Sequence, residues 1–181
     1  MNFRELEIKG VIEITPTVFN DSRGYFFEFF HRQTFAKNGI AEDFLQDNHS
    51  YSLPGVIRGL HFQKTPHAQK KLVRILKGKI FDVAVDLRRD SPTFGQSISL
   101  IMDDQKHNMI YIPGGFAHGF AAMEESIVNY KCTALYHKES ECGIRFDDPR
   151  LNIQWPVDQA IVSDKDKILK SFDELVKLGE I

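Results

Sequence analysis

Residues 80–88 read Ile-Phe-Asp-Val-Ala-Val-Asp-Leu-Arg, and this stretch decides the fold class of the 181-residue chain. One side of the alternation is wholly apolar and consists of Phe81, Val83, Val85 and Leu87. The other side consists of Asp82, Ala84 and Asp86. Successive side chains of an extended segment point to opposite faces, so this pattern predicts a half-buried β-strand.

Short strand-like runs occur on both sides of this stretch. Val11–Phe19 and Tyr25–Phe30 are separated by Asn-Asp-Ser-Arg-Gly, which predicts a hairpin. Further strands are predicted at Val56–Gln63, Leu72–Lys77, Gln96–Met102, Asn108–Ile112 and Ile127–Tyr136, with a strand also following the turn at 113–115. Many short strands with close turn signals are typical of a β-sandwich or β-barrel.

Helical signals are confined to two places. Arg32–Asn38 predicts a short helix that ends at Gly39. Near the C-terminus, apolar residues at 168, 169, 172, 175 and 176 predict an amphipathic helix over about 164–178. Ser163 and Asp166 resemble a capping box at its start. We therefore expect one domain over 1–181: an all-β jelly-roll barrel with short peripheral helices and a C-terminal helix.

Composition excludes several classes of function. The chain has 23 Lys and Arg against 25 Asp and Glu, a net charge of −2, and no basic run that would bind nucleic acid or a membrane surface. No apolar stretch is long enough to span a membrane, and the N-terminus lacks the apolar region of a signal peptide. Cys132 and Cys142 form no Cys-x-x-Cys pair, which suits reduced thiols in the cytoplasm.

His61 lies in the predicted strand Val56–Gln63 and is a candidate general base, because histidine exchanges protons near neutral pH. A purely structural histidine is the alternative. Strict alternation would put Arg58 and His61 on opposite faces of this strand. Both can face one cavity only if Gly59 marks a β-bulge.

Residues 113–120 read Pro-Gly-Gly-Phe-Ala-His-Gly-Phe and resemble the second sequence motif of cupin barrels, with His118 as its histidine. The first cupin motif of metal-binding members contains His-x-His, whereas this chain has His61-Phe62-Gln63. None of the seven histidines forms a His-x-His pair. We therefore expect no metal site.

Four other residues can carry chemistry, and each also has a structural interpretation. Tyr130 and Tyr136 are six residues apart on one predicted strand face, where a phenol can donate a proton or a ring can stack; both also suit strand packing. Lys71 can stabilise an oxyanion or sit at a solvated strand end. Asp166 can orient His61 or cap the final helix.

Taken together, these residues resemble one family, the dTDP-4-dehydrorhamnose 3,5-epimerases, which are cupin-fold enzymes of nucleotide-sugar biosynthesis. The resemblance extends from about Val11 to Asp166. The two most specific blocks are Gln46–Ser50 and Arg58–Gln63. Further matching segments are 21–24, 71–74, 81–86, 91–95, 112–120, 130–132, 143–149 and 163–166. One departure is Tyr136-His137-Lys138, where the family often has Tyr-x-Pro.

The resemblance implies a role for each matching residue. His61 is the general base with Asp166 as its partner, Tyr130 is the proton donor, and Lys71 stabilises the enolate. Tyr136 stacks on the nucleotide base. The other residues implied to hold the nucleotide sugar are Arg23, Glu28, Gln46, Asn48, Arg58, His118, Glu141 and Lys165.

The same resemblance implies inversion of C3 and C5 of dTDP-4-dehydro-6-deoxy-D-glucose, a step of dTDP-rhamnose biosynthesis that supplies carbohydrates such as O-antigen. Protons next to a C4 ketone are acidic, so the reaction requires no nicotinamide, pyridoxal or metal cofactor. A homodimer is implied as well. The alternatives are an epimerase of C3 or C5 alone acting on a related sugar, a metal-dependent cupin, and a sugar-binding cupin without catalysis.

Overall fold

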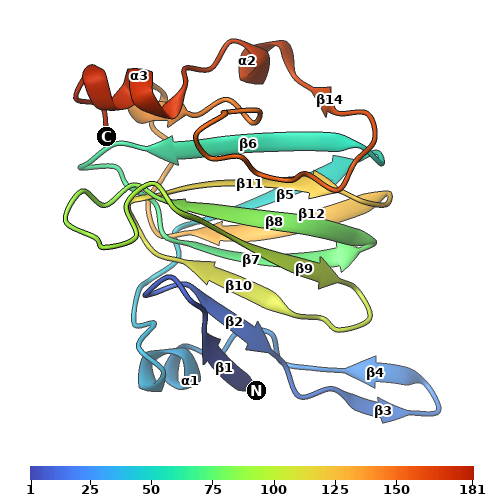
Figure 1. Ribbon diagram of the computed structural model, residues 1–181. Coiled ribbons are helices and arrows are strands. Elements are labelled where there is room, and N and C mark those ends of the chain that lie inside the picture. The colour runs from blue at the N-terminus through green and yellow to red at the C-terminus, as the bar shows by residue number, and fades with distance from the viewer.

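Figure 1 shows the computed structural model, which describes residues 1–181. The strands are β1 (Asn2–Glu5), β2 (Ile12–Thr15), β3 (Phe19–Asp21), β4 (Gly24–Phe26), β5 (Gln46–Ser52), β6 (Val56–Gln63), β7 (Lys71–Lys77), β8 (Lys79–Asp86), β9 (Ser97–Asp103), β10 (Met109–Ile112), β11 (Phe116–Ala122), β12 (Ser126–Cys132), β13 (Glu141–Gly143) and β14 (Ile161–Val162). The helices are α1 (Arg32–Lys37), α2 (Asp164–Lys167) and α3 (Phe172–Lys177), with a 3-10 turn, η1 (Lys138–Ser140).

Two large sheets lie face to face and enclose the main core (Figure 1). One has the order β1-β2-β10-β7-β12-β5, and the other has the order β13-β6-β11-β8-β9, with β14 beside β6. Neighbouring strands are antiparallel except β14, which runs parallel to β6. The predicted all-β jelly-roll architecture is confirmed.

Strand β8 is buried on both faces, so the prediction of a half-buried strand was wrong. Its even-numbered side chains point between the sheets, where Ile80 and Ala84 join the main core. Its odd-numbered side chains, including Val83 and Val85, pack under Phe172 from the C-terminal segment. The C-terminal segment thus covers the apolar face of β8, and the face with Asp82, which the alternation would leave to solvent, lies inside the barrel.

The predicted C-terminal helix over 164–178 is two short helices, α2 and α3. Lys170 interrupts the helical path because it forms a parallel bridge with Ile144. Ser171 then starts α3 with a complete capping box to Glu174. Only part of the predicted apolar face is buried. Phe172 and Leu175 of α3 are fully buried, whereas Ile168 is 83% exposed. No helix here has the length and apolar character needed to cross a membrane.

The predicted hairpin near the N-terminus is present, but its strands are shorter than expected. Val11–Phe19 is divided into β2 and β3, with Pro16 between them, and Tyr25–Phe30 contributes only β4. β3 and β4 form a separate two-stranded sheet that extends away from the barrel (Figure 1). The predicted helix over Arg32–Asn38 is confirmed as α1, followed by Gly39 at φ +85°.

A β-bulge in β6 determines which side chains enter the barrel. His61 pairs with His118 and Arg58 pairs with Phe120, so two residues of β6 oppose one residue of β11. Gly59 has φ +121°, a conformation that favours glycine. A Cβ atom at Gly59 would lie 2.5 Å from Gly119 Cα. The condition set from sequence is therefore met: Gly59 marks a bulge, and Arg58 and His61 both line one cavity.

Gly59→Ala should lower the free energy of unfolding by about 2–4 kcal/mol, because the new methyl group meets backbone in a strained conformation. Gly39→Ala is the matched control, since its φ is also positive but no heavy atom lies within 4 Å of the added Cβ. This control should lose only about 1–2 kcal/mol. Denaturant unfolding measures the free energy of unfolding of both variants. Equal losses would contradict the claim that the backbone contact at Gly59 adds to the cost of the substitution.

Candidate active site

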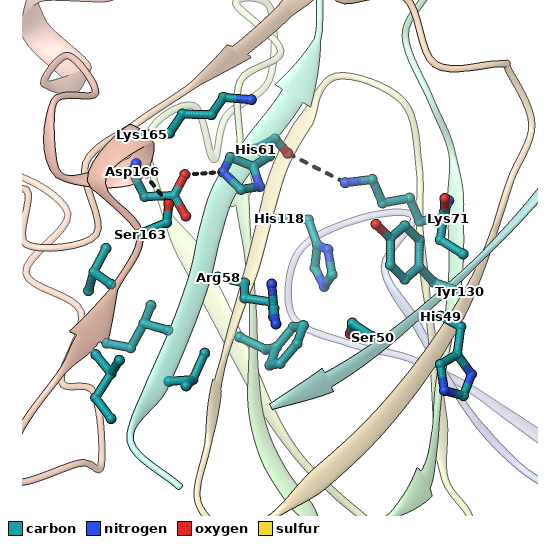
Figure 2. Close-up of a pocket in the computed structure, with 16 residues that line it drawn as sticks. His49, Ser50, Arg58, His61, Lys71, His118, Tyr130, Ser163, Lys165 and Asp166 are labelled. Carbon is teal, nitrogen blue, oxygen red and sulfur yellow. Dashed lines mark hydrogen bonds and ion pairs between the residues drawn. The ribbon is translucent and has the colours of Figure 1, made fainter. Parts of the chain in front are cut away.

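A cavity of about 590 Å³ opens between the two sheets at the bulged end of β6 (Figure 2). Eight of the thirteen predicted site residues line it: Asn48, Arg58, His61, Lys71, His118, Tyr130, Lys165 and Asp166. β6 and β11 belong to one sheet and supply Arg58, His61 and His118, while β7 and β12 belong to the other and supply Lys71 and Tyr130. A molecule in the cavity would therefore meet His61 and Tyr130 from opposite walls.

His61 is held by the buried carboxylate of Asp166. His61 Nε2 donates to Asp166 Oδ1 over 2.7 Å, and Gly59 N donates to Asp166 Oδ2 over 3.4 Å. A carboxylate only accepts, so the ring hydrogen lies on Nε2 and Nδ1 is left as the free base. Burial alone would raise the pKa of Asp166, but the hydrogen bond from His61 lowers it. Asp166 is thus an anion that stabilises the imidazolium.

The cap of helix α2 is Ser163, so the carboxylate of Asp166 is not needed as a helix cap. Ser163 Oγ accepts from the backbone N of Asp166 over 3.1 Å and caps α2. The carboxylate of Asp166 is directed at His61 and Gly59 instead of the helix start. The capping-box resemblance was therefore right for Ser163, while the side chain of Asp166 belongs to the cavity.

Lys71 and Tyr130 approach the cavity from the sheet opposite His61. Lys71 Nζ donates to the His61 carbonyl oxygen over 3.5 Å and lies 5.9 Å from the centre of the Tyr130 ring. Burial lowers the pKa of Lys71 and raises the pKa of Tyr130. At neutral pH the Tyr130 phenol therefore keeps its proton, as a proton donor requires.

His118 forms a second buried pair, with Asp82. His118 Nε2 lies 2.9 Å from Asp82 Oδ2, and the side chains are 6% and 0% exposed. Burial lowers the pKa of His118, against the attraction of Asp82. The sequence interpretation missed Asp82 as a partner, although the alternation of residues 80–88 placed it on a polar strand face. Its pairing depends on β11 lying beside β8, which sequence pattern alone does not specify.

A smaller cavity of about 100 Å³ continues from the first, sharing Asn48, His61, Lys71 and Tyr130 as lining residues. Its far wall contains Tyr136 and Glu141. Tyr136 Oη donates to Glu141 Oε2 over 2.9 Å, and Lys165 pairs with the same carboxylate at 2.6 Å. Burial alone would raise the pKa of Glu141, but the bonds from Lys165 and Tyr136 lower it.

Tyr136 does not lie on the strand predicted for Ile127–Tyr136. β12 ends at Cys132, and Tyr136 lies in the loop before η1. The prediction that Tyr130 and Tyr136 share one strand face was therefore wrong. From Ala134 the backbone is bonded by side chains instead of a neighbouring strand, with Ala134 O accepting from Gln69 and His137 N donating to Gln63.

Three further predicted residues lie outside both cavities. Gln46 stands behind the wall, where its amide donates to Asn48 Oδ1 over 2.9 Å and its oxygen accepts from Tyr136 N over 2.8 Å. Arg23 lies in the β3–β4 turn, 88% exposed at its side chain and paired with Asp21. Glu28 follows β4 on the same arm. Within one chain, the structure does not bring Arg23 and Glu28 to the other site residues.

Several cavity residues were absent from the sequence prediction. They are His49, Ser50, Val56, Ile57, Phe120, Ile161, Val162 and Ser163. Ser50 belongs to β5, whose polar sequence gave no apolar periodicity and which was not predicted as a strand. Ile161 and Val162 form the two-residue strand β14, which is too short to produce a pattern.

The sequence profile of the dTDP-4-dehydrorhamnose 3,5-epimerases matches residues 5–174. The chain belongs to this family. The enzyme of this name from Methanothermobacter thermautotrophicus is 49% identical over 176 residues, covering 95% of each chain. Members of this family are isomerases, so the chain is an enzyme of the epimerase class.

Solved structures give the same result. The dTDP-6-deoxy-D-glucose-3,5-epimerase of Legionella pneumophila, solved in complex with dTDP-4-keto-L-rhamnose, is 42% identical with a TM-score of 0.92, covering 95% of this chain and 93% of that one. A 3′-monoepimerase of Streptomyces bikiniensis, solved with dTDP-quinovose, is 30% identical with a TM-score of 0.90, covering 96% and 89%. The cupin-type fold expected from sequence is thereby confirmed.

Proposed function

We propose that this enzyme inverts C3 and C5 of dTDP-4-dehydro-6-deoxy-D-glucose and forms dTDP-4-dehydro-L-rhamnose. The observation that carries the proposal is the placement of His61 with Asp166 on one wall of the cavity and Tyr130 on the other. Inversion at carbon requires a base on one face of the sugar and an acid on the opposite face. A binding protein does not require that arrangement.

Each inversion proceeds in two proton transfers. His61 Nδ1 removes the proton from the carbon next to the ketone, and the C–H electron pair forms the enolate with its charge on O4. Lys71 stabilises that charge by electrostatics in a buried site. Tyr130 then gives its phenolic proton to the opposite face of the carbon. Because C3 and C5 both flank C4, one base and one acid can serve both positions after solvent restores their protonation.

Cationic and polar side chains of the cavity can bind the nucleotide part of the substrate. Arg58 is oriented by Nε donating to Ser52 Oγ over 3.0 Å and a terminal nitrogen donating to Tyr51 O over 2.9 Å. Arg58 and Lys165 offer positive charge to a diphosphate, and Asn48 offers an amide. We propose that the nucleobase of the substrate stacks on the aromatic ring of Tyr136, beside Glu141.

Inversion at C3 alone is the second candidate, because the chain also resembles a 3′-monoepimerase. The base, the acid and the oxyanion group are the same for one inversion as for two. Double inversion is favoured because the relatives named as 3,5-epimerases are 49% and 42% identical to this chain, against 30% for the 3′-monoepimerase. The position of isotope in the product separates the two functions.

We further propose a cytoplasmic homodimer in which the β3–β4 arm reaches the cavity of its partner. Phe19, Tyr25 and Phe26 of this arm are 62%, 61% and 69% exposed, which is unusual for large apolar side chains on a projecting hairpin. Transfer to a partner would cover them and would bring Arg23 and Glu28 to the second cavity. The two free cysteines suit a reducing compartment.

With dTDP-4-dehydro-6-deoxy-D-glucose in deuterium oxide, the wild type should form the inverted product with deuterium at both C3 and C5, located by NMR. His61→Ala should lower the rate of exchange at both carbons by about 10³-fold or more, because it removes the base. His31→Ala, at the start of α1 and outside both cavities, is the control and should react at the wild-type rate. Deuterium at C3 alone would support the single epimerase, and exchange by His61→Ala at the wild-type rate would exclude His61 as the base.

Mixing two inactive variants tests the arm. In a dimer with crossed arms, His61→Ala and Arg23→Ala subunits form mixed dimers in which one of the two sites is intact. Random re-association should restore about a quarter of the wild-type activity. No recovery, with a dimeric mass by light scattering, would place the arm on its own subunit, and a monomeric mass would reject the dimer.

A further inference from the structure

Residues 133–137 form the loop that presents Tyr136, and glutamine side chains from three other segments hold its backbone. We propose that Gln63 and Gln69, which line the smaller cavity and are given no role above, are positioning residues that fix this loop for nucleotide binding. The inference rests on the proposed function, because it concerns the same site. Neither side chain needs to touch the reacting carbons.

Gln63 makes the central contacts of this clamp. Its Nε2 donates to Leu135 O over 3.2 Å and to His67 O over 2.7 Å, and its Oε1 accepts from His137 N over 2.7 Å. The side chain is 7% exposed, so these bonds satisfy an amide that is shielded from water. One buried amide thereby joins the loop on each side of Tyr136 to the segment after β6.

Gln69 and Gln46 hold the neighbouring backbone groups. Gln69 Nε2 donates to Ala134 O over 2.8 Å, and Gln46 Oε1 accepts from Tyr136 N over 2.8 Å. Four consecutive residues, 134–137, are therefore each bound through the backbone by a glutamine side chain. The imidazole rings of His67 and His137 also stack, with centroids 3.8 Å apart and planes 4° apart, and they tie the same two segments together.

Polar contacts are decisive here because the loop has little apolar anchoring. Leu135 and Tyr136 are 62% and 54% exposed. Burial of these side chains therefore contributes little to fixing the loop. The clamp supplies the order that packing does not.

The position of Gln63 in β6 explains how it reaches the loop. It lies two residues after His61, so both side chains point to the same side of the strand. In metal-binding cupins that position carries the second histidine of His-x-His. Here its amide is committed to loop backbone on both its nitrogen and its oxygen. Gln63 therefore supports the loop that carries Tyr136 and is not available as a metal ligand.

Gln63→Met tests the clamp, because methionine keeps the length of the side chain and removes all three bonds. We expect KM and the Kd for dTDP to rise about tenfold, which corresponds to about 1.4 kcal/mol, with kcat reduced less than threefold. His61, Lys71 and Tyr130 lie on strands and keep their geometry. The His137 amide should also exchange with deuterium at least tenfold faster. Gln154→Met, at an exposed glutamine that bonds only to Asn152, should change none of these quantities.

A double variant distinguishes positioning from general destabilisation. If Gln63 acts through Tyr136, Gln63→Met should weaken dTDP binding tenfold in the wild type but less than twofold in a Tyr136→Ala background. Independent, multiplicative effects would overturn the proposal, as would unchanged exchange of the His137 amide in Gln63→Met. Should Gln63→Met fail to fold, Gln69→Met removes the bond to Ala134 O and provides the dTDP-binding test and the double-variant test with Tyr136→Ala. A wild type that binds dTDP but epimerises nothing would reject the proposed reaction and leave the amide-exchange and dTDP-binding tests of the clamp in force.

Discussion

The β-bulge at Gly59 is the constraint on which the site depends. A regular strand would direct either Arg58 or His61 out of the barrel, and the bulge turns both toward one cavity. The Asp166 carboxylate bonds to the His61 ring and to the backbone N–H of Gly59. The same anion therefore orients the base and contacts the backbone irregularity that aims it. Gly119 completes the fit, because a Cβ there would lie 2.7 Å from Arg58 O.

Burial between the two sheets gives each ionisable group the state that epimerisation needs. A raised pKa keeps Tyr130 protonated at neutral pH, and a lowered pKa keeps Asp166 anionic beside His61. Burial lowers the pKa of Lys71, and the same low-polarity surroundings strengthen its attraction for an enolate oxygen. A jelly roll suits this chemistry because its two sheets present side chains to one enclosed space from opposite directions.

Local pattern predicted much of the fold and the central dyad. Alternation located β8 and required a bulge at Gly59 if Arg58 and His61 were to share one cavity, and resemblance paired His61 with Asp166. Features that depend on distant segments were missed. Polar β5 has no apolar period, Lys170 leaves the helix to pair with Ile144, and loop 133–137 is shaped by glutamines from elsewhere in the chain. Arg23 and Glu28 were expected at the site, and no single-chain contact brings them there.

The central claim is that His61 and Tyr130 act on opposite faces of one sugar, and Tyr130→Phe tests it most directly. The variant removes the phenolic proton while leaving His61 able to take a proton and return deuterium from solvent to the same face. In deuterium oxide, exchange at C3 or C5 should persist while inverted product becomes scarce, so the ratio of exchange to inversion should rise sharply. A ratio equal to that of the wild type would contradict the account and show that the proton comes from another group.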